Sequence, residues 1–184
     1  MMEISKDVGM VFQNFNLFPH KSVIENIIEG PMRVLKKSKE QSKSEAREIL
    51  SFLGLSEKED SYPHQLSGGQ KQRLALARTI ITNPEIYIFD EATSNIDVES
   101  EEKIWRSIYE LSENKTVIVI SHRLANVKNA DNIYVLDKGN IVESGSHKDL
   151  MMYNGKYAQL VNHQNNLESI YNDELTQKEV AISE

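Results

Sequence analysis

The stretch Leu66-Ser67-Gly68-Gly69-Gln70-Lys71-Gln72-Arg73 decides how this chain folds, and it stands directly before the mostly apolar run 74–81. Ser67 and Gln70 have the spacing of a capping box, in which each side chain satisfies a free backbone N–H of the first helical turn. The two glycines leave the backbone amides open to a ligand, and such amides at a helix N-terminus attract phosphate through their donors and the helix dipole. The stretch therefore predicts a helix start, and its first four residues alone do not decide between a plain cap and an anion site.

A second motif, Ile86-Tyr87-Ile88-Phe89-Asp90-Glu91, follows shortly afterwards. Its apolar half is typical of a strand buried on both faces of a parallel sheet. Together the two stretches resemble the signature motif and the Walker B strand of the ATP-binding cassette (ABC) ATPases. The resemblance implies an α/β fold of the P-loop NTPase (RecA-like) type, in which a parallel sheet carries an inserted α-helical subdomain, and it implies ATP and Mg²⁺ as ligands.

Asp90 and Glu91 are the candidate catalytic carboxylates. They follow the strand at the carboxyl edge of the expected sheet, where ligands bind in open α/β folds. Hydrolysis of a nucleoside triphosphate needs a carboxylate near magnesium and a group that orients the attacking water. Asp90 suits the metal, and Glu91 suits the role of general base. An isolated Asp-Glu pair is commonly plain acidic surface, but its place after the signature favours the catalytic interpretation.

Two further polar residues follow expected strands. Gln13 comes after Val8–Phe12 and resembles the Q-loop glutamine, which senses magnesium and water and links the site to the membrane partner. His122 comes after the apolar run 116–121, and Ile120-Ser121-His122-Arg123 resembles the switch-histidine loop that contacts the γ-phosphate. Each residue alone is weak support, but all four elements occur in the order of the family.

The resemblance also implies contacts between two cassettes. In the family, the signature residues bind the nucleotide that is held by another cassette; here they are Ser67, Gly68, Gly69 and Gln70. The stretch 92–97 resembles the D-loop, which faces the other subunit, although Asn95-Ile96 stands where members usually carry Ala-Leu. Asp97 ends this stretch and by composition also caps the helix that follows.

The Walker A motif Gly-x-x-x-x-Gly-Lys-Ser/Thr, which holds the triphosphate, does not occur in the sequence. The Gly155-Lys156 pair fails because Leu150 and Tyr157 stand where the motif needs glycine and Ser/Thr. We therefore expect a cassette whose N-terminal part is missing, such as a truncated or split gene product. Its strands would keep an unpaired edge and uncovered apolar faces, and the chain alone would neither bind ATP tightly nor hydrolyse it at a useful rate.

The resemblance implies three segments, which are the end of a core strand with the Q-loop (1–13), the helical subdomain with the signature (14–83) and the RecA-like core (84–165). The composition predicts a loose acidic tail at 166–184. In the helical subdomain, Ser22 stands three residues before Glu25 and predicts a capped helix. Gly30-Pro31 is expected to end that helix. The lysine-rich stretch 36–43 is expected to be a solvated connection, and a helix with Gly54 as its C-terminal cap begins at Ser44.

The second half has a different pattern. A strand–helix–strand unit is expected first and is followed by a hairpin and two closing helices, at residues 86–89, 98–111, 116–120, 133–143, 146–152 and 156–163. The Lys138-Gly139-Asn140 stretch is the expected hairpin turn.

The composition excludes several functions. The net charge is −7 and the sequence has no cysteine. An acidic balance argues against nucleic acid as a partner, and without cysteine there are no disulfides, thiolate nucleophiles or cysteine metal sites. The scattered histidines do not suggest zinc. No apolar run reaches membrane-spanning length, so we expect a soluble intracellular chain.

The loop 14–22 is the candidate partner surface. Phe15, Leu17 and Phe18 lie close together before Pro19, and apolar side chains on a loop are either tucked beneath it or offered to a partner. The resemblance favours contact with transmembrane permease subunits, which places the chain on the cytoplasmic side, peripheral to the inner face of the cell membrane. It also implies a second cassette as partner, in a homodimer or a heterodimer.

The two halves resemble different transporters. Residues 12–20 and 62–66 resemble the cassettes of polar amino acid importers, whereas residues 121–125, 139–147 and 155–157 resemble multidrug or lipid exporter cassettes. The coupling region lies in the first half and favours amino acid import. Two alternatives stay open, a non-transport ABC protein and a catalytically incompetent subunit that only donates its signature.

Overall fold

The protein is described by a computed structural model that covers residues 7–12, 14–91 and 98–166. The chain divides between Ile120 and Ser121 into two compact units, each with its own hydrophobic core. None of the helices in the described ranges is long and apolar enough to cross a membrane.

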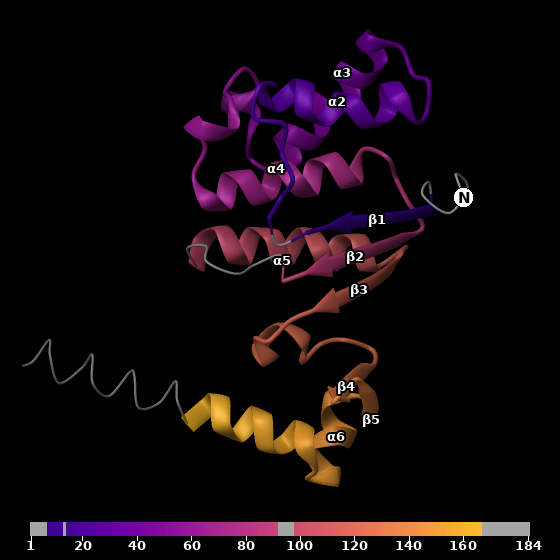
Figure 1. Ribbon diagram of the computed structural model, residues 1–184, viewed down its shortest axis with the longest axis vertical. Helices are drawn as coiled ribbons and strands as arrows, with labels where there is room; N and C mark the ends of the chain where they lie inside the picture. Colours follow the sequence, from indigo (N-terminus) through magenta and orange to yellow (C-terminus); the bar gives the residue numbers. More distant parts are fainter. Residues whose placement is uncertain (1–6, 13, 92–97, 167–184) are drawn as a thin grey trace, which may run out of the picture. The chain divides into compact units, whose positions relative to one another are not determined.

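The first unit contains a parallel sheet. Its strands are β1 (Val8–Val11), β2 (Ile86–Asp90) and β3 (Thr116–Ile120), in the order β1-β2-β3 (Figure 1). Val11 lies opposite Phe89, and Asp90 lies opposite Ile120. All three strands run the same way, so their carboxyl ends meet at one edge, as the sequence predicted for the strands that carry the candidate site.

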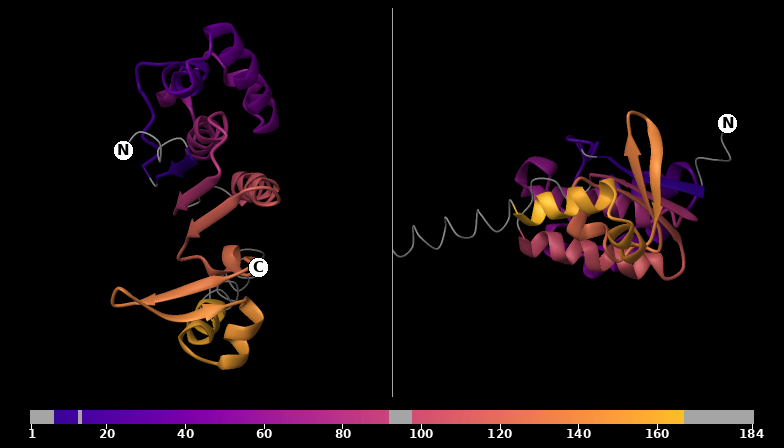
Figure 2. Two further views of the ribbon diagram at one scale, coloured as in Figure 1. Left: turned by 90° about the vertical axis from the view of Figure 1, so that its right-hand side faces the viewer. Right: turned by 90° about the horizontal axis from the view of Figure 1, so that it is seen from below.

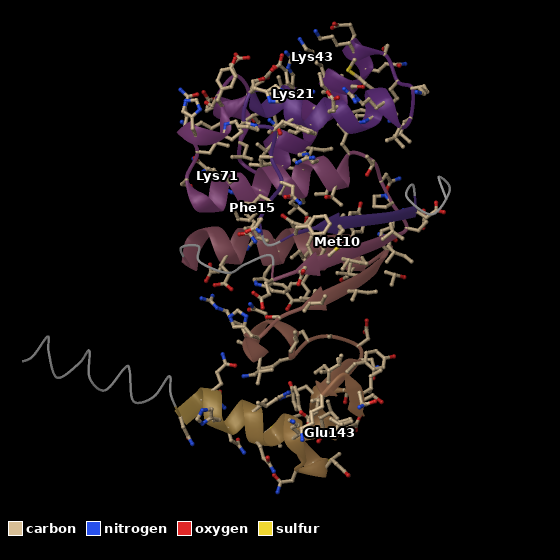
Figure 3. The ribbon with its side chains drawn as sticks, viewed as in Figure 1. Met10, Phe15, Lys21, Lys43, Lys71 and Glu143 are labelled. Atoms are coloured by element: carbon tan, nitrogen blue, oxygen red, sulfur yellow. The ribbon has the colours of Figure 1, made fainter. Side chains whose placement is uncertain are left out.

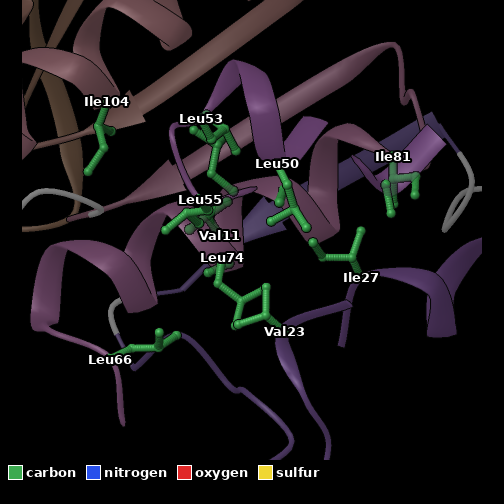
Figure 4. Close-up of a cluster of buried hydrophobic side chains, with 14 of the residues drawn as sticks. Val11, Val23, Ile27, Leu50, Leu53, Leu55, Leu66, Leu74, Ile81 and Ile104 are labelled. Atoms are coloured by element: carbon green, nitrogen blue, oxygen red, sulfur yellow. The ribbon is translucent and has the colours of Figure 1, made fainter. Parts of the chain in front are cut away.

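The described helices of this unit are α2 (Val23–Arg33), α3 (Lys39–Phe52), α4 (Gly68–Ile80) and α5 (Val98–Ser112). Helices α4 and α5 pack on the sheet, and α2 and α3 pack on α4. Short 3₁₀ turns at Ser56–Lys58 and Pro63–Gln65 connect α3 to α4. The core between α2, α3 and α4 is apolar and includes Ile27, Leu50 and Leu74, all at most 1% exposed (Figure 4). Fully burying side chains of this size stabilises a fold by roughly 1.5–3 kcal/mol each.

Helix α2 corrects one expectation. Ser22 and Glu25 form the predicted capping box, but Gly30-Pro31 does not end the helix, which continues to Arg33 with Pro31 inside it. The Pro31 ring is buried, and Val34 and Leu35 still donate to the carbonyls of Gly30 and Pro31. Proline removes one helix hydrogen bond and usually kinks or breaks a helix; here the buried ring and the bonds that follow it offset that loss.

The stretch 36–43 corrects a second expectation. Helix α3 begins at Lys39, because Ser38 and Gln41 form a capping box that the search for apolar periodicity missed. Lys37 is ion-paired with Glu45, at 2.6 Å between Nζ and Oε2. The solvated connection is therefore short. The predicted end of this helix is confirmed, since Gly54 has a φ of +64°.

The sheet is buried on one face. Figure 2 shows α4 and α5 on one side of the strands. Tyr87 and Phe89 are 1% exposed and share a core with residues of these two helices, whereas Ile118 and Ile120 on β3 are 47% and 50% exposed. Apolar runs such as that of β3 are typical of strands buried on both faces, but β3 has an uncovered apolar face in the described residues, as expected from the sequence of this chain. Within the described residues β3 pairs with β2 alone, as expected for an uncovered apolar strand with an unpaired edge.

The second unit is built on a hairpin of β4 (Ile133–Asp137) and β5 (Asn140–Gly145). Lys138 and Gly139 have φ of +49° and +79°, which confirms the predicted tight turn. Helix α6 (His147–Tyr153) and a helical segment at 156–166 cover the hairpin, as predicted. A small core joins the hairpin to these helices and contains Ile133, Val135, Leu150, Tyr157 and Val161.

The Gly155-Lys156 pair, which fails as a phosphate loop, has a structural role in this unit. The Glu143 carboxylate on β5 accepts hydrogen bonds from the backbone amides of Lys156 and Tyr157, the latter at 3.0 Å (Figure 3). A Cβ on Gly155 would lie 2.7 Å from Cδ1 of Tyr153 and closer still to the Glu143 carboxylate. Glycine lets the Glu143 carboxylate approach this backbone closely, and the two amides bind a side chain of the protein itself.

Candidate functional site

The start of α4 forms the first part of the site. Ser67 is the N-cap; its amide donates to Oε1 of Gln70 at 2.9 Å, and the Gln70 amide donates to Oγ of Ser67 at 3.3 Å. The predicted capping box is confirmed. Ser67 and Gly68 are exposed and Gly69 is buried. The amides of Gly68 and Gly69 stand in the first turn, where no helix carbonyl is available to them, so they suit an anionic ligand.

Helix α4 presents this turn at the carboxyl edge of the sheet. The helix runs back against β2, which follows it in sequence, so it begins on the side where the strands end (Figure 1). Buried Arg73 joins the start of α4 to the end of α3, because its Nη1 donates to the Leu53 carbonyl at 3.1 Å and its Nε donates to the Gly69 carbonyl at 3.4 Å. Arg73 was not singled out from the sequence, where it stands directly before the apolar run 74–81, because its role depends on the distant Leu53 carbonyl.

Asp90 and Glu91 lie at the same edge of the sheet. Asp90 is the last residue of β2 and is partly exposed. Glu91 has a left-handed backbone with a φ of +47°, and its amide donates to the Ile120 carbonyl at 2.9 Å. A non-glycine residue in this conformation costs roughly 1–2 kcal/mol, and such strain clusters at functional sites. The structure thus places both carboxylates in the unit that carries the start of α4.

His122 lies in the second unit, two residues after β3 ends. Its side chain is exposed, and the backbone around it is fixed by Ser121, whose hydroxyl accepts from the Arg123 amide at 3.0 Å and donates to the Arg123 carbonyl at 3.1 Å. The two remaining candidates, Gln13 and Asp97, fall outside the described residues.

The donor set fits a magnesium nucleotide. In the described ranges no three His, Cys, Asp or Glu side chains gather in a metal-binding cluster. Mg²⁺ at nucleotide sites is commonly held by one or two carboxylates together with substrate phosphates and water. Asp90 can supply such a carboxylate, and the Ser67 hydroxyl with the amides of Gly68 and Gly69 can separately bind the phosphate oxygens of a nucleotide held by another cassette.

A hollow of about 350 Å³ opens beside the loop that follows β1. It is lined by β1, this loop, α2 and α4, with Asn26 and Arg78 among its polar residues. Phe15 and Leu17 pack partly against the core, and Phe18 is half-buried. These three side chains are therefore neither fully buried beneath the loop nor fully exposed to a partner protein.

Gln72 is a buried polar residue of the signature helix that sequence reasoning also missed. Its side chain is 1% exposed, and both carboxamide atoms lack a hydrogen-bond partner. An unsatisfied buried polar group costs about 1–3 kcal/mol.

We therefore predict that Gln72→Leu, which is similar in size, raises the free energy of unfolding by about 1–2 kcal/mol in urea titrations followed by far-UV circular dichroism. Gln70→Leu in the same helix is the matched control and should lower it by about 0.5–1 kcal/mol, because Gln70 completes the cap. A loss of stability in Gln72→Leu would contradict this prediction.

Comparison with known proteins gives the family. The sequence model of the family described as ABC transporter matches residues 1–94. The chain belongs to the ABC transporter family. The matched range contains the signature helix and the two carboxylates at the end of β2, which are the features that suggested the family.

Among curated proteins, this cassette is similar to amino acid transport proteins. It is 45% identical over 150 residues to the L-cystine transport system ATP-binding protein TcyN of Escherichia coli (strain K12), covering 80% of this chain and 60% of TcyN. It is 42% identical over 153 residues to the arginine transport ATP-binding protein ArtM of Bacillus subtilis (strain 168), covering 82% of this chain and 64% of ArtM. The chain thus spans less than two thirds of either relative.

Solved structures confirm the predicted α/β cassette fold. A bacterial Atm1-family ABC exporter with ATP bound matches with a TM-score of 0.77 and 32% identity, covering 88% of this chain and 29% of the exporter. The cassette MJ0796, in a dimeric post-hydrolysis state bound to ADP and Pi, matches with a TM-score of 0.72 and 32% identity. That match covers 78% of this chain and 65% of MJ0796.

Proposed function

We propose that this chain is an ATP-binding subunit of an ABC importer for polar amino acids. The observation that carries the proposal is the box-capped glycine start of α4 at the carboxyl edge of the sheet. This arrangement occurs in a chain that resembles the cystine and arginine transport proteins TcyN and ArtM. Support for the nucleotide comes from the ATP and ADP bound in the similar exporter and cassette structures.

The catalytic roles in this proposal follow the family pattern. Asp90 holds Mg²⁺, Glu91 orients the attacking water as general base, and His122 contacts the γ-phosphate. Gln13 and Asp97 are proposed to sense the metal and to face the second cassette. The signature residues Ser67–Gln70 bind a nucleotide held by that second cassette, as expected for two cassettes packed head to tail.

The 184 residues contain a signature but no Walker A motif, so we propose that they supply half of a composite site. Loss of the loop amides and lysine removes much of the electrostatic stabilisation of the transferred phosphoryl group. We expect no measurable ATP turnover by the purified chain alone, and turnover above that of the partner alone when an intact cassette is added. A coupled assay of released phosphate measures both. Robust turnover by the chain alone would refute the half-site proposal.

The partner surface in this proposal is the loop 14–22 with the neighbouring hollow. Its half-buried Phe18, together with Phe15 and Leu17, offers apolar area beside Arg78 and Asn26. Transmembrane permease subunits are the proposed occupants, which would hold the chain at the inner face of the membrane. Co-purification with permease subunits tests transport against a non-transport ABC role.

A second candidate is the cassette of a multidrug or lipid exporter. It is favoured by the similarity of 88% of this chain to the Atm1-family exporter. Reconstitution into vesicles with a candidate permease separates the two, because ATP turnover stimulated by a polar amino acid favours import and turnover stimulated by an apolar drug or lipid favours export.

A further inference from the structure

The turn at Phe15–Asn16, near the start of the loop 14–22, has a strained backbone. Phe15 and Asn16 both adopt left-handed conformations, with φ of +55° and +45°. For a residue as bulky as phenylalanine such a φ is a genuine outlier. It persists only where surrounding contacts impose it.

Within the loop, the Phe15 amide donates to the Phe12 carbonyl at 3.0 Å. Arg78 of the signature helix supplies the contacts from outside the loop. Its Nη1 donates to the Asn16 carbonyl at 2.6 Å and reaches the Phe15 carbonyl at 3.5 Å. Its guanidinium carbon lies 4.9 Å from the centre of the Phe18 ring, within the range of a cation–π contact. The left-handed turn points the carbonyls of Phe15 and Asn16 at one guanidinium. The hydrogen bonds to Arg78 therefore help to offset the strain of the turn.

Burial strengthens this arrangement. Desolvation lowers the pKa of Arg78, which shows that its guanidinium is partly removed from water, and in this environment hydrogen bonds to carbonyls and contact with the Phe18 ring contribute more. The other side of the loop is fixed by Asn26 of α2, whose Oδ1 accepts from the Phe18 amide at 2.9 Å and whose Nδ2 donates to the Phe18 carbonyl at 3.1 Å. The loop is therefore bonded to two helices, and Arg78 is its link to α4.

We propose that Arg78 is a positioning residue that holds the Phe15–Asn16 turn on α4, so that the signature helix and the partner-facing loop move as one piece. That this loop faces the permease rests on the proposed function. The hydrogen bonds of Arg78 join α4, which is proposed to contact the nucleotide, to the loop 14–22, which is proposed to contact the permease. A shift of α4 on nucleotide binding would then be passed to the loop through these bonds.

The test is hydrogen exchange of the amides of Phe15, Asn16 and Phe18, measured by mass spectrometry on the full chain. Arg78→Met removes the donors and the charge, and we expect these amides to exchange about tenfold faster, as loss of a charge-assisted hydrogen bond implies. Arg78→Lys keeps the charge and should lie in between. Arg33→Met is the matched control, because Arg33 lines the same hollow from α2 but is exposed and paired with Glu29.

A second substitution tests whether Arg78 holds the strained turn in place or only fills space beside it. Glycine adopts a positive φ without strain, so Asn16→Gly should reduce the effect of Arg78→Met to less than about threefold when both are present. If the two changes simply add, or if Arg78→Met leaves the loop amides unchanged, the proposal is overturned. Failure of ATP turnover in the mixed dimer, with this exchange pattern intact, would instead refute the proposed function alone.

Discussion

Gly68→Asp is expected to abolish ATP turnover in a mixed dimer of this chain with an intact cassette, by about 100-fold or more. Gly68 is the exposed first residue of α4. An aspartate there places a carboxylate beside the proposed phosphate site, and losing one such electrostatic contact typically costs 10²–10³ in rate, roughly. The measurement is phosphate release at saturating partner concentration.

The fold should survive this change. Aspartate is a better helix residue than glycine, and a negative charge in the first turn gains about 0.3–1 kcal/mol from the helix dipole. Thermal unfolding should therefore be unchanged or slightly raised, which separates loss of activity from loss of structure. Unaltered turnover in a folded Gly68→Asp chain would contradict the signature role.

Lys39→Asp is the matched control for Gly68→Asp. Lys39 is the exposed first residue of α3, and Ser38 and Gln41 cap that helix with the same kind of box. The charge change is larger, but no phosphate is proposed there, so turnover should equal that of the unmodified chain. A similar loss in both variants would point to a nonspecific effect of charge.

Glu143→Ala is expected to destabilise the second unit by about 2 kcal/mol or more. The Glu143 carboxylate accepts from the amides of Lys156 and Tyr157 at the start of the helical segment 156–166. Hydrogen bonds to a charged group contribute about 1.5–3 kcal/mol each, and alanine leaves both amides without this acceptor. Hydrogen exchange over residues 133–161 measures the change, with rates expected to rise about thirtyfold.

Two variants calibrate this prediction. Glu143→Gln keeps a neutral acceptor and should lose about half as much stability. Ser144→Ala, at the exposed next position of β5, should leave exchange unchanged. Equal exchange in Glu143→Ala and the unmodified chain would show that the carboxylate does not hold the helix.

The elements that could be predicted from the sequence are those decided by contacts a few residues apart. The capping boxes at Ser22 and Ser67 and the turn at Lys138-Gly139 need only the spacing of their own residues. The strands of the parallel sheet were also predictable, because their apolar runs are continuous. Pro31 shows the limit of such local rules, since burial of its ring overrode the preference that should have ended α2.

The site divides in the same way. Ser67, Gly68, Gly69, Asp90 and Glu91 could be singled out because the chemistry of phosphate and magnesium demands those residue types next to a helix start or a strand end. Arg73 and Arg78 could not, because their partners, the carbonyls of Leu53 and Asn16, are far away in sequence. Neither arginine is unusual until the fold brings those carbonyls to it.

The sequence by itself thus determined the family, the signature helix and the order of the sheet-edge residues, since each depends on short-range spacing. Only the tertiary structure decided which distant segments the signature helix contacts, namely α3 and the loop after β1. Its stretch 66–73 is capped locally, whereas the apolar core it shares with α3 and the hydrogen bonds from two arginines to backbone carbonyls of distant segments depend on the fold. Such bonds are set by packing, which brings segments together irrespective of their separation in the chain.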